Sequence, residues 1–131
     1  MTPPAERRVY LAGPIMGQSD AAMYDWRISV TRALGGRVSN PADRDYRGRE
    51  DETFREIVEQ DKADIAGCVA VLALVSPPSA GTSMEILFAY ERGIPVVAWS
   101  ESARVSPWVR YHAAHVVRSR SDAVAAVRGY L

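Results

Sequence analysis

The chain has 131 residues, enough for one domain with a hydrophobic core and too few for two. We therefore expect a single domain over residues 1–131, with residues 1–6 as a loose tail. Hydrophobic residues make up 47% and charged residues 24%, which is typical of a globular protein. Sixteen basic residues balance sixteen acidic ones, so no overall field favours a nucleic acid polymer or an anionic membrane. The single cysteine, Cys68, excludes an internal disulfide and a cysteine-based zinc cluster.

Membrane insertion is not expected, because no segment approaches the roughly 20 apolar residues that a spanning helix requires. The apolar run from Val9 to Met16 is short and contains Gly13 and Pro14, so it predicts a first buried strand rather than a secretion signal. We predict a cytoplasmic protein that needs no metal ion and no cofactor. His112 and His115 lack matched cysteine or acidic neighbours, and neither is interpreted as a metal ligand.

Short apolar strands alternate with helical patterns along the chain. We predict strands at 9–12, 37–39, 69–75, 95–99 and 115–117, helices at 21–34, 52–66 and about 82–92, a last helix capped at 121–122, and a surface loop at 42–50. This alternation predicts an α/β fold: a five-stranded parallel sheet, doubly wound as in Rossmann or flavodoxin-like folds, with helices on both faces. Ligands of such folds bind beyond the carboxyl ends of the strands.

The segment from Pro77 to Glu85 joins the third predicted strand to the third predicted helix, and it is rich in hydroxyl groups. Backbone N–H groups at a helix start favour anions, so a carboxylate in the same turn is unusual. The pairing favours chemistry on a phosphorylated or sugar-like substrate. The alternative is local: Thr82 and Glu85 have the spacing of a capping box, in which Glu85 reaches back to the N–H of Thr82, and Ser79 is a turn residue.

Asp61 is the second candidate, because it falls on the stripe formed by Phe54, Val58 and Ile65 in the second predicted helix. A carboxylate on a buried apolar face has a perturbed pKa and often marks a site. The alternative is that Asp61 pairs with an arginine or caps a loop. Tyr10 lies in the first buried strand, where plain core packing with a satisfied hydroxyl is the alternative to a functional role.

Several segments together resemble the nucleoside 2-deoxyribosyltransferase superfamily, in the order that this family has. They are Val9-Tyr10-Leu11-Ala12-Gly13-Pro14-Ile15, Asp25-Trp26-Arg27, Asn40-Pro41-Ala42, Asp61 with Ile65, Gly81-Thr82-Ser83-Met84-Glu85 with Ala89, and Gly93-Ile94-Pro95-Val96. The resemblance covers roughly residues 9 to 112. It implies an enzyme that cleaves the N-glycosidic bond between a nucleobase and a sugar.

The resemblance also implies the catalytic roles. Glu85 matches the glutamate that attacks C1′ of the sugar, Asp61 matches the aspartate that assists protonation of the leaving base, and Tyr10 matches the tyrosine that orients the nucleophile. The transition state of such a reaction is oxocarbenium-like, so a carboxylate facing the sugar stabilises it or forms a covalent intermediate.

Two branches of the superfamily differ in the acceptor, which is a second base in the transferases and water in the nucleoside 5′-monophosphate hydrolases. The turn that contains Ser79 and Gly81, followed by Thr82, resembles the hydrolase branch, in which it holds the 5′-phosphate. The hydrolases also hold phosphate with a serine and an arginine in the first loop, where this chain has Pro14 and Met16. The resemblance then leaves the phosphate contacts of that loop to Gly13, to the backbone of Ile15 and Gly17, or to Arg27.

The remaining implied contacts concern the base and a second subunit. Base recognition would fall to Asn40, Asp43 and Arg44, whose alternative is a solvated loop. Ser106 is the nearest match to the polar residue that family members supply from a neighbouring subunit, which implies a homodimer. We thus favour a nucleoside 5′-monophosphate N-glycosidase, with a base-exchanging deoxyribosyltransferase and a non-catalytic nucleotide-binding module as alternatives.

Overall fold

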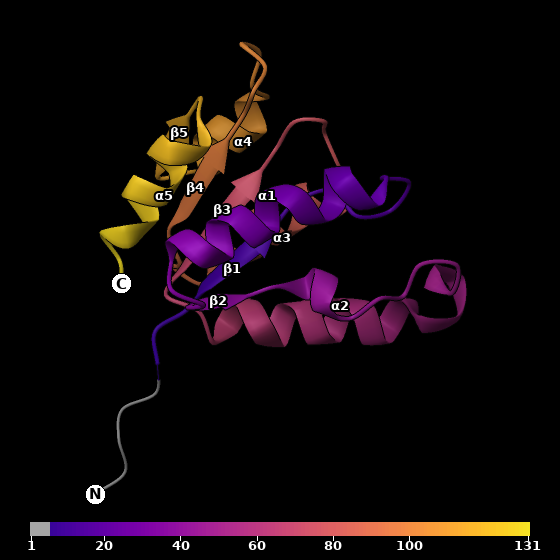
Figure 1. The fold of residues 1–131 in the computed structure, drawn as a ribbon. Helices are drawn as coiled ribbons and strands as arrows, with labels where there is room; N and C mark the ends of the chain where they lie inside the picture. Colours follow the sequence, from indigo (N-terminus) through magenta and orange to yellow (C-terminus); the bar gives the residue numbers. More distant parts are fainter. Residues whose placement is uncertain (1–5) are drawn as a thin grey trace, which may run out of the picture.

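Five parallel strands form one sheet in the computed structural model, which describes residues 6–131 (Figure 1). The strand order is β2-β1-β3-β4-β5, so the predicted five-stranded, all-parallel α/β fold is confirmed. The strands are β1 (Val9–Ala12), β2 (Val38–Ser39), β3 (Ala70–Leu74), β4 (Val96–Trp99) and β5 (His115–Val117). The predicted tail at residues 1–6 lies outside the described range except for Glu6.

The helices cover both faces of this sheet. They are α1 (Asp20–Ala33), α2 (Glu50–Ala66), α3 (Ala80–Glu91), α4 (Pro107–His112) and α5 (Arg120–Arg128), together with a short 3-10 turn at Pro41–Asp43. Helices α1 and α5 pack on the strand side chains of one face of the sheet and form one hydrophobic cluster with them. Helices α2, α3 and α4 pack on the opposite face and form a second cluster.

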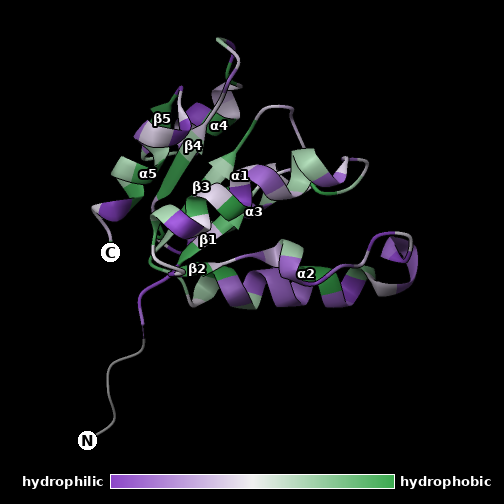
Figure 2. Ribbon diagram, in the orientation of Figure 1, coloured by the Kyte–Doolittle hydropathy of each residue, from purple (hydrophilic) through white to green (hydrophobic). Residues whose placement is uncertain are grey.

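Strand alternation separates the two faces residue by residue. Leu11 of β1 and Leu74 of β3 face α1 and α5, whereas Tyr10 of β1 and Ala73 of β3 belong to the cluster under α2, α3 and α4. Successive residues of β1, β3 and β4 are buried on both faces, which explains why these strands read as continuous apolar runs. In Figure 2 the strands β3 and β4 are green, whereas α2 is mostly purple and α1 and α5 mix purple with green.

Several predicted boundaries were wrong, and each error has a local cause. Helix α3 begins at Ala80 rather than near Thr82, because Ser79 is its N-cap and accepts from the backbone N–H of Thr82. Helix α5 is capped by Ser119 rather than by residues 121–122. The predicted loop at 42–50 contains most of the 3-10 turn and the first residue of α2. Helix α4 was not predicted, since its six residues are too few to show a periodic pattern.

The predicted burial of the α2 stripe was also wrong. Phe54 is 55% exposed and Val58 is 48% exposed, so Ile65 is the buried residue of this helix. In Figure 1 the amino-terminal half of α2 extends beyond the strands, which leaves its apolar side chains without a sheet to cover. Asp61 and the buried Ile65 both lie in the carboxyl-terminal half of α2. Within residues 6–131, none of the helices has the length and apolar character that crossing a membrane requires.

Candidate active site

Tyr10 and Glu85 meet on the face of the sheet that α2, α3 and α4 cover. The phenol of Tyr10 in β1 donates a hydrogen bond to the carboxylate of Glu85, which lies in the second turn of α3. The capping-box alternative is therefore wrong, because the Glu85 carboxylate points to β1 rather than back to Thr82. Two of the three predicted catalytic residues are in direct contact.

Burial controls the charge state of this pair. It raises the pKa of the Glu85 carboxyl to about 7. The hydrogen bond from Tyr10 opposes this rise in pKa, the negative charge of Asp61 adds to it, and the positive charge of Arg27 opposes it. Burial, followed by the charge of Glu85, also raises the pKa of the Tyr10 phenol far above its usual value. Tyr10 therefore stays protonated and acts as a donor, while Glu85 can change its charge near neutral pH.

Asp61 approaches the same site from α2. Its carboxylate accepts a hydrogen bond from Arg44 at 3.2 Å, and the same guanidinium group donates to Asp64 at 2.7 Å. Burial raises the pKa of Asp61 despite the opposing effect of Arg44. Sequence reasoning missed Asp64, although its position three residues after Asp61 places both carboxylates on one face of α2 and could have revealed the shared arginine.

Arg27 is a fully buried arginine that supports the ends of two strands. It donates to the carbonyl oxygens of Leu11 at 2.7 Å and Gly13 at 3.0 Å, and to the side-chain oxygen of Asn40 at 2.9 Å. Its guanidinium carbon lies 4.6 Å from the centre of the Trp26 ring. Burial lowers the pKa of Arg27 to about 10, which leaves it charged at neutral pH. These bonds give Arg27 a role in holding the first loop rather than a free guanidinium for a phosphate.

The turn before α3 carries the predicted phosphate contacts. The side-chain oxygen of Ser79 caps the helix, and its carbonyl oxygen accepts from Ser83. Thr82 is buried, and its hydroxyl has no hydrogen-bond partner among residues 6–131. Gly81 is exposed, and a Cβ added there would meet only the Ser79 side chain, at 4.0 Å. The chain itself therefore does not require glycine at position 81.

The first loop follows β1. A Cβ on Gly13 would lie 2.6 Å from the Trp26 ring, so packing alone requires this glycine. Gly17 has a φ of +77°, a conformation that favours glycine in the turn before α1. The carbonyl of Ile15 accepts from the backbone of Gln18 at 3.2 Å in that turn.

The remaining predicted contacts lie at two separate places. Asn40 caps the 3-10 turn, accepting from the backbone of Ala42 at 3.0 Å, and Asp43 is exposed at the end of that turn. Ser106 is exposed and caps α4, accepting from the backbone of Trp108 at 3.2 Å. Among residues 6–131, no group of three or more His, Cys, Asp or Glu side chains is arranged to hold a metal ion.

Comparison with known proteins places the chain in a family. A family model described as nucleoside 2-deoxyribosyltransferase matches residues 9–125. The chain belongs to the nucleoside 2-deoxyribosyltransferase family. The predicted superfamily is thereby confirmed, and with it the prediction of an enzyme. A comparison with curated protein sequences finds no significant match.

Solved structures share the fold at low sequence identity. A 2-deoxyribosyltransferase from Bacillus psychrosaccharolyticus is 18% identical with a TM-score of 0.73, and the match covers 88% of each chain. A conserved protein from Enterococcus faecalis V583 is 20% identical with a TM-score of 0.73, covering 97% of this chain and 100% of that one. The CMP N-glycosidase of Clostridium botulinum is 15% identical with a TM-score of 0.61, covering 93% and 99%.

Proposed function

We propose that this member of the deoxyribosyltransferase family hydrolyses the N-glycosidic bond of a nucleoside 5′-monophosphate, releasing the free base and the sugar 5-phosphate. The observation that carries the proposal is the hydrogen bond from Tyr10 to Glu85, with Asp61 close enough to raise the pKa of both groups. A carboxylate that is held by a phenol and flanked by a second carboxyl group has the composition of a glycosidic-bond-cleaving site.

Each side chain takes one step of the reaction. Ionised Glu85 attacks C1′ while the C1′–N bond breaks, and Asp61 donates a proton to the leaving base. Water then attacks C1′ and passes one proton to the ionised Asp61; the bond from C1′ to Glu85 breaks, and the sugar keeps a hydroxyl group at that carbon. The raised pKa of Asp61 suits a proton donor, and Tyr10 fixes the carboxylate orientation. Base recognition by Asn40, Asp43 and Arg44 belongs to this proposal.

The turn before α3 supports a phosphorylated substrate. Backbone N–H groups can bind an anion at this turn, because it contains the N-cap and the first residues of a twelve-residue helix and because Gly81 is exposed. Ser79, Gly81 and Thr82 would hold the 5′-phosphate, and Glu85, one turn further along, would face C1′. The backbone of Ile15 and Gly17 would close the other side of the phosphate.

Base exchange by a deoxyribosyltransferase is the second candidate. The family model carries that description, and the deoxyribosyltransferase structure has a higher TM-score than the CMP N-glycosidase, 0.73 against 0.61. Both activities use the same attack on C1′, so the candidates differ only in whether water or a second base completes the reaction.

A homodimer is part of the proposal. Exposed apolar side chains gather on the layer formed by α2, α3 and α4, in which each helix contacts the next. They are Phe54, Val58, Met84, Leu87, Tyr90, Trp108 and Tyr111. A second copy would cover them, since exposed apolar side chains that cluster on one face mark an interface. Ser106, at the start of α4, would then be presented to the neighbouring subunit.

The test is a panel of ribo- and deoxyribonucleoside 5′-monophosphates with the matching nucleosides, followed by chromatography for free base. Hydrolysis of monophosphates without an added base supports the proposal. Faster turnover of unphosphorylated deoxynucleosides, with incorporation of a second base, would establish the transferase instead. Binding without any base release would leave a nucleotide-binding module.

A further inference from the structure

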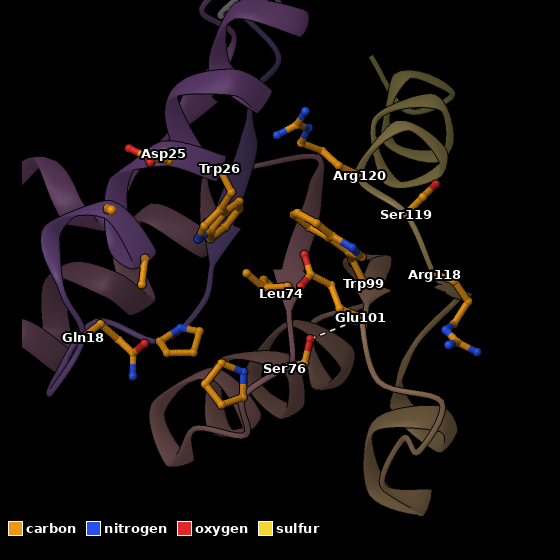
Figure 3. Close-up of a pocket in the computed structure, with 14 residues that line it drawn as sticks. Gln18, Asp25, Trp26, Leu74, Ser76, Trp99, Glu101, Arg118, Ser119 and Arg120 are labelled. Atoms are coloured by element: carbon orange, nitrogen blue, oxygen red, sulfur yellow. Dashed lines mark hydrogen bonds between the residues drawn. The ribbon is translucent and has the colours of Figure 1, made fainter.

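A cavity of about 590 Å³ lies between α1 and α5 at the carboxyl edge of the sheet (Figure 3). The loops after four strands line it, contributing Pro14 after β1, Ser76 and Pro77 after β3, Glu101 after β4 and Arg118 after β5. Its volume falls within the roughly 300–1,000 Å³ of small-molecule sites. Its position is the one at which doubly wound folds bind ligands.

This cavity is distinct from the Glu85 site. Its walls include Leu74, Trp26 and Trp99, which belong to the cluster under α1 and α5, whereas Tyr10 belongs to the cluster on the other face of the sheet. Tyr10, Asp61 and Glu85 do not line it. The proposed homodimer face, on α2, α3 and α4, also lies on that opposite face and leaves the cavity open.

The two places are nevertheless joined by one short segment. Glu85 lies in the second turn of α3, Ser79 caps that helix, and Ser76 and Pro77 form the wall of the cavity immediately before it. A substrate with C1′ at Glu85 and its 5′-phosphate at Ser79 would place that phosphate at the end of α3 that directly follows the cavity-lining residues Ser76 and Pro77. Any group attached to that phosphate would enter the space between α1 and α5.

The cavity walls combine aromatic, anionic and cationic side chains. Trp26 and Trp99 meet edge to face with their centroids 5.8 Å apart, and Figure 3 shows Leu74 next to this pair. The carboxylate of Glu101 points into the middle of the cavity, and its backbone N–H donates to the Ser76 hydroxyl at 2.9 Å. Arg120 extends from the start of α5 toward α1, whereas the guanidinium of Arg118 turns outward.

These walls do not suit a bare anion, because the carboxylate of Glu101 would repel it. They suit a group with a phosphate near Arg120, hydroxyl or amino donors at Glu101, and the flat apolar face of a base against the wall that Trp26, Leu74 and Trp99 form. A second nucleoside joined through a diphosphate has all three features.

We propose that this cavity holds the distal half of a dinucleotide, so that the preferred substrate is a nucleoside 5′-diphosphate joined to a second nucleoside rather than a bare monophosphate. This inference rests on the proposed function. In the reaction, the C1′–N bond of the proximal nucleoside breaks, water supplies the new hydroxyl group on C1′, and the base leaves with a proton. The diphosphate linkage stays intact.

The first experiment measures binding to the Glu85→Gln protein by calorimetry, so that it does not depend on turnover. The probes are a 5′–5′ dinucleoside diphosphate and the matching monophosphate, carrying the base that the substrate panel identifies, or adenine if no base is released. We expect the dinucleotide to bind at least about tenfold more tightly, as a charge-assisted contact at Arg120 implies. Equal affinity for the two probes would overturn the proposal even if the enzyme hydrolyses monophosphates.

Two exposed cavity residues provide the second arm. Adding Arg120→Ala or Glu101→Ala to the Glu85→Gln protein should remove the tenfold preference and leave monophosphate affinity within about twofold. Arg32→Ala, an exposed arginine in the last turn of α1, is the matched control and should change neither affinity. If the variants lose affinity equally for the dinucleotide and the monophosphate, Arg120 and Glu101 contact the monophosphate itself. That result would contradict a separate distal site. If the wild-type protein releases no base from any substrate of the panel but the Glu85→Gln protein still prefers the dinucleotide, the proposed hydrolysis is wrong and the proposed dinucleotide site is supported.

Discussion

Tyr10 and Glu85 are separated by 75 positions in the chain, yet the phenol of one donates directly to the carboxylate of the other. Parallel pairing of β1 with β3 produces this contact, because α3 follows β3 and packs over the face to which Tyr10 points. The contact joins a strand residue that could have been ordinary core to a helix residue that could have been an ordinary cap.

Removing the Tyr10 hydroxyl should impair the nucleophile. We expect Tyr10→Phe to lower kcat at pH 7 by about 10- to 100-fold, because the ionised carboxylate loses its donor. Since the hydrogen bond from Tyr10 lowers the pKa of Glu85, its loss should also move the acid limb of the pH–rate profile to higher pH. The profile of Tyr24→Phe, a partly buried tyrosine on α1, should match the wild type. An acid limb that stays at the wild-type pH in Tyr10→Phe would show that the hydrogen bond from Tyr10 does not control the pKa of Glu85.

Glu85 should make stability depend on pH. Its folded pKa of about 7 lies above the value of 4.5 expected when unfolded, so the folded state favours the protonated form. This contribution is fully present below about pH 4.5 and is lost as pH rises through about 7. Glu85→Gln should therefore be more stable than the wild type at pH 8, by about 1–3 kcal/mol, with little difference at pH 4.5. Urea unfolding at both pH values measures the difference, and equal stabilities at pH 8 would contradict the raised pKa.

Two glycines should respond in opposite ways to the same substitution. Gly13→Ala places a Cβ 2.6 Å from the Trp26 ring and should destabilise the fold by about 2–4 kcal/mol. Gly81→Ala meets no close atom, so the fold should tolerate it, whereas KM for a phosphorylated substrate should rise about tenfold. Thermal unfolding of both variants measures the loss of stability from poor packing, and steady-state kinetics measures the change in KM for the phosphorylated substrate. An unchanged KM in Gly81→Ala would remove the turn from the proposed phosphate site.

Arg27 should be important for folding. Replacing it with methionine leaves the carbonyl oxygens of Leu11 and Gly13 without their donor in a buried place. We expect Arg27→Met to lose about 2–4 kcal/mol, and Arg27→Lys to recover part of this. The free energy of unfolding in urea is the measurement. A stability within about 0.5 kcal/mol of the wild type would show that these carbonyl groups find other donors.

The sheet could be predicted because β1, β3 and β4 are buried on both faces and read as unbroken apolar runs. The fine structure of the site could not. Ser79 and Thr82 both have the residue type of an N-cap, and only packing of α3 selects Ser79. The stripe through Phe54 and Val58 has the period of a buried face, but α2 extends past the sheet that would bury it. The cavity near Trp99 depends on the side-by-side placement of α1 and α5, which local sequence does not encode.

The proposed catalytic role of Glu85 is tested most directly by base release from the preferred nucleotide with wild type, Glu85→Gln and Glu91→Gln. The exposed Glu91 ends the same helix and provides the control. We predict that Glu85→Gln loses at least about 1,000-fold in kcat with its fold and substrate binding retained, while Glu91→Gln stays within about twofold of the wild type. Substantial base release by folded Glu85→Gln protein would contradict the account.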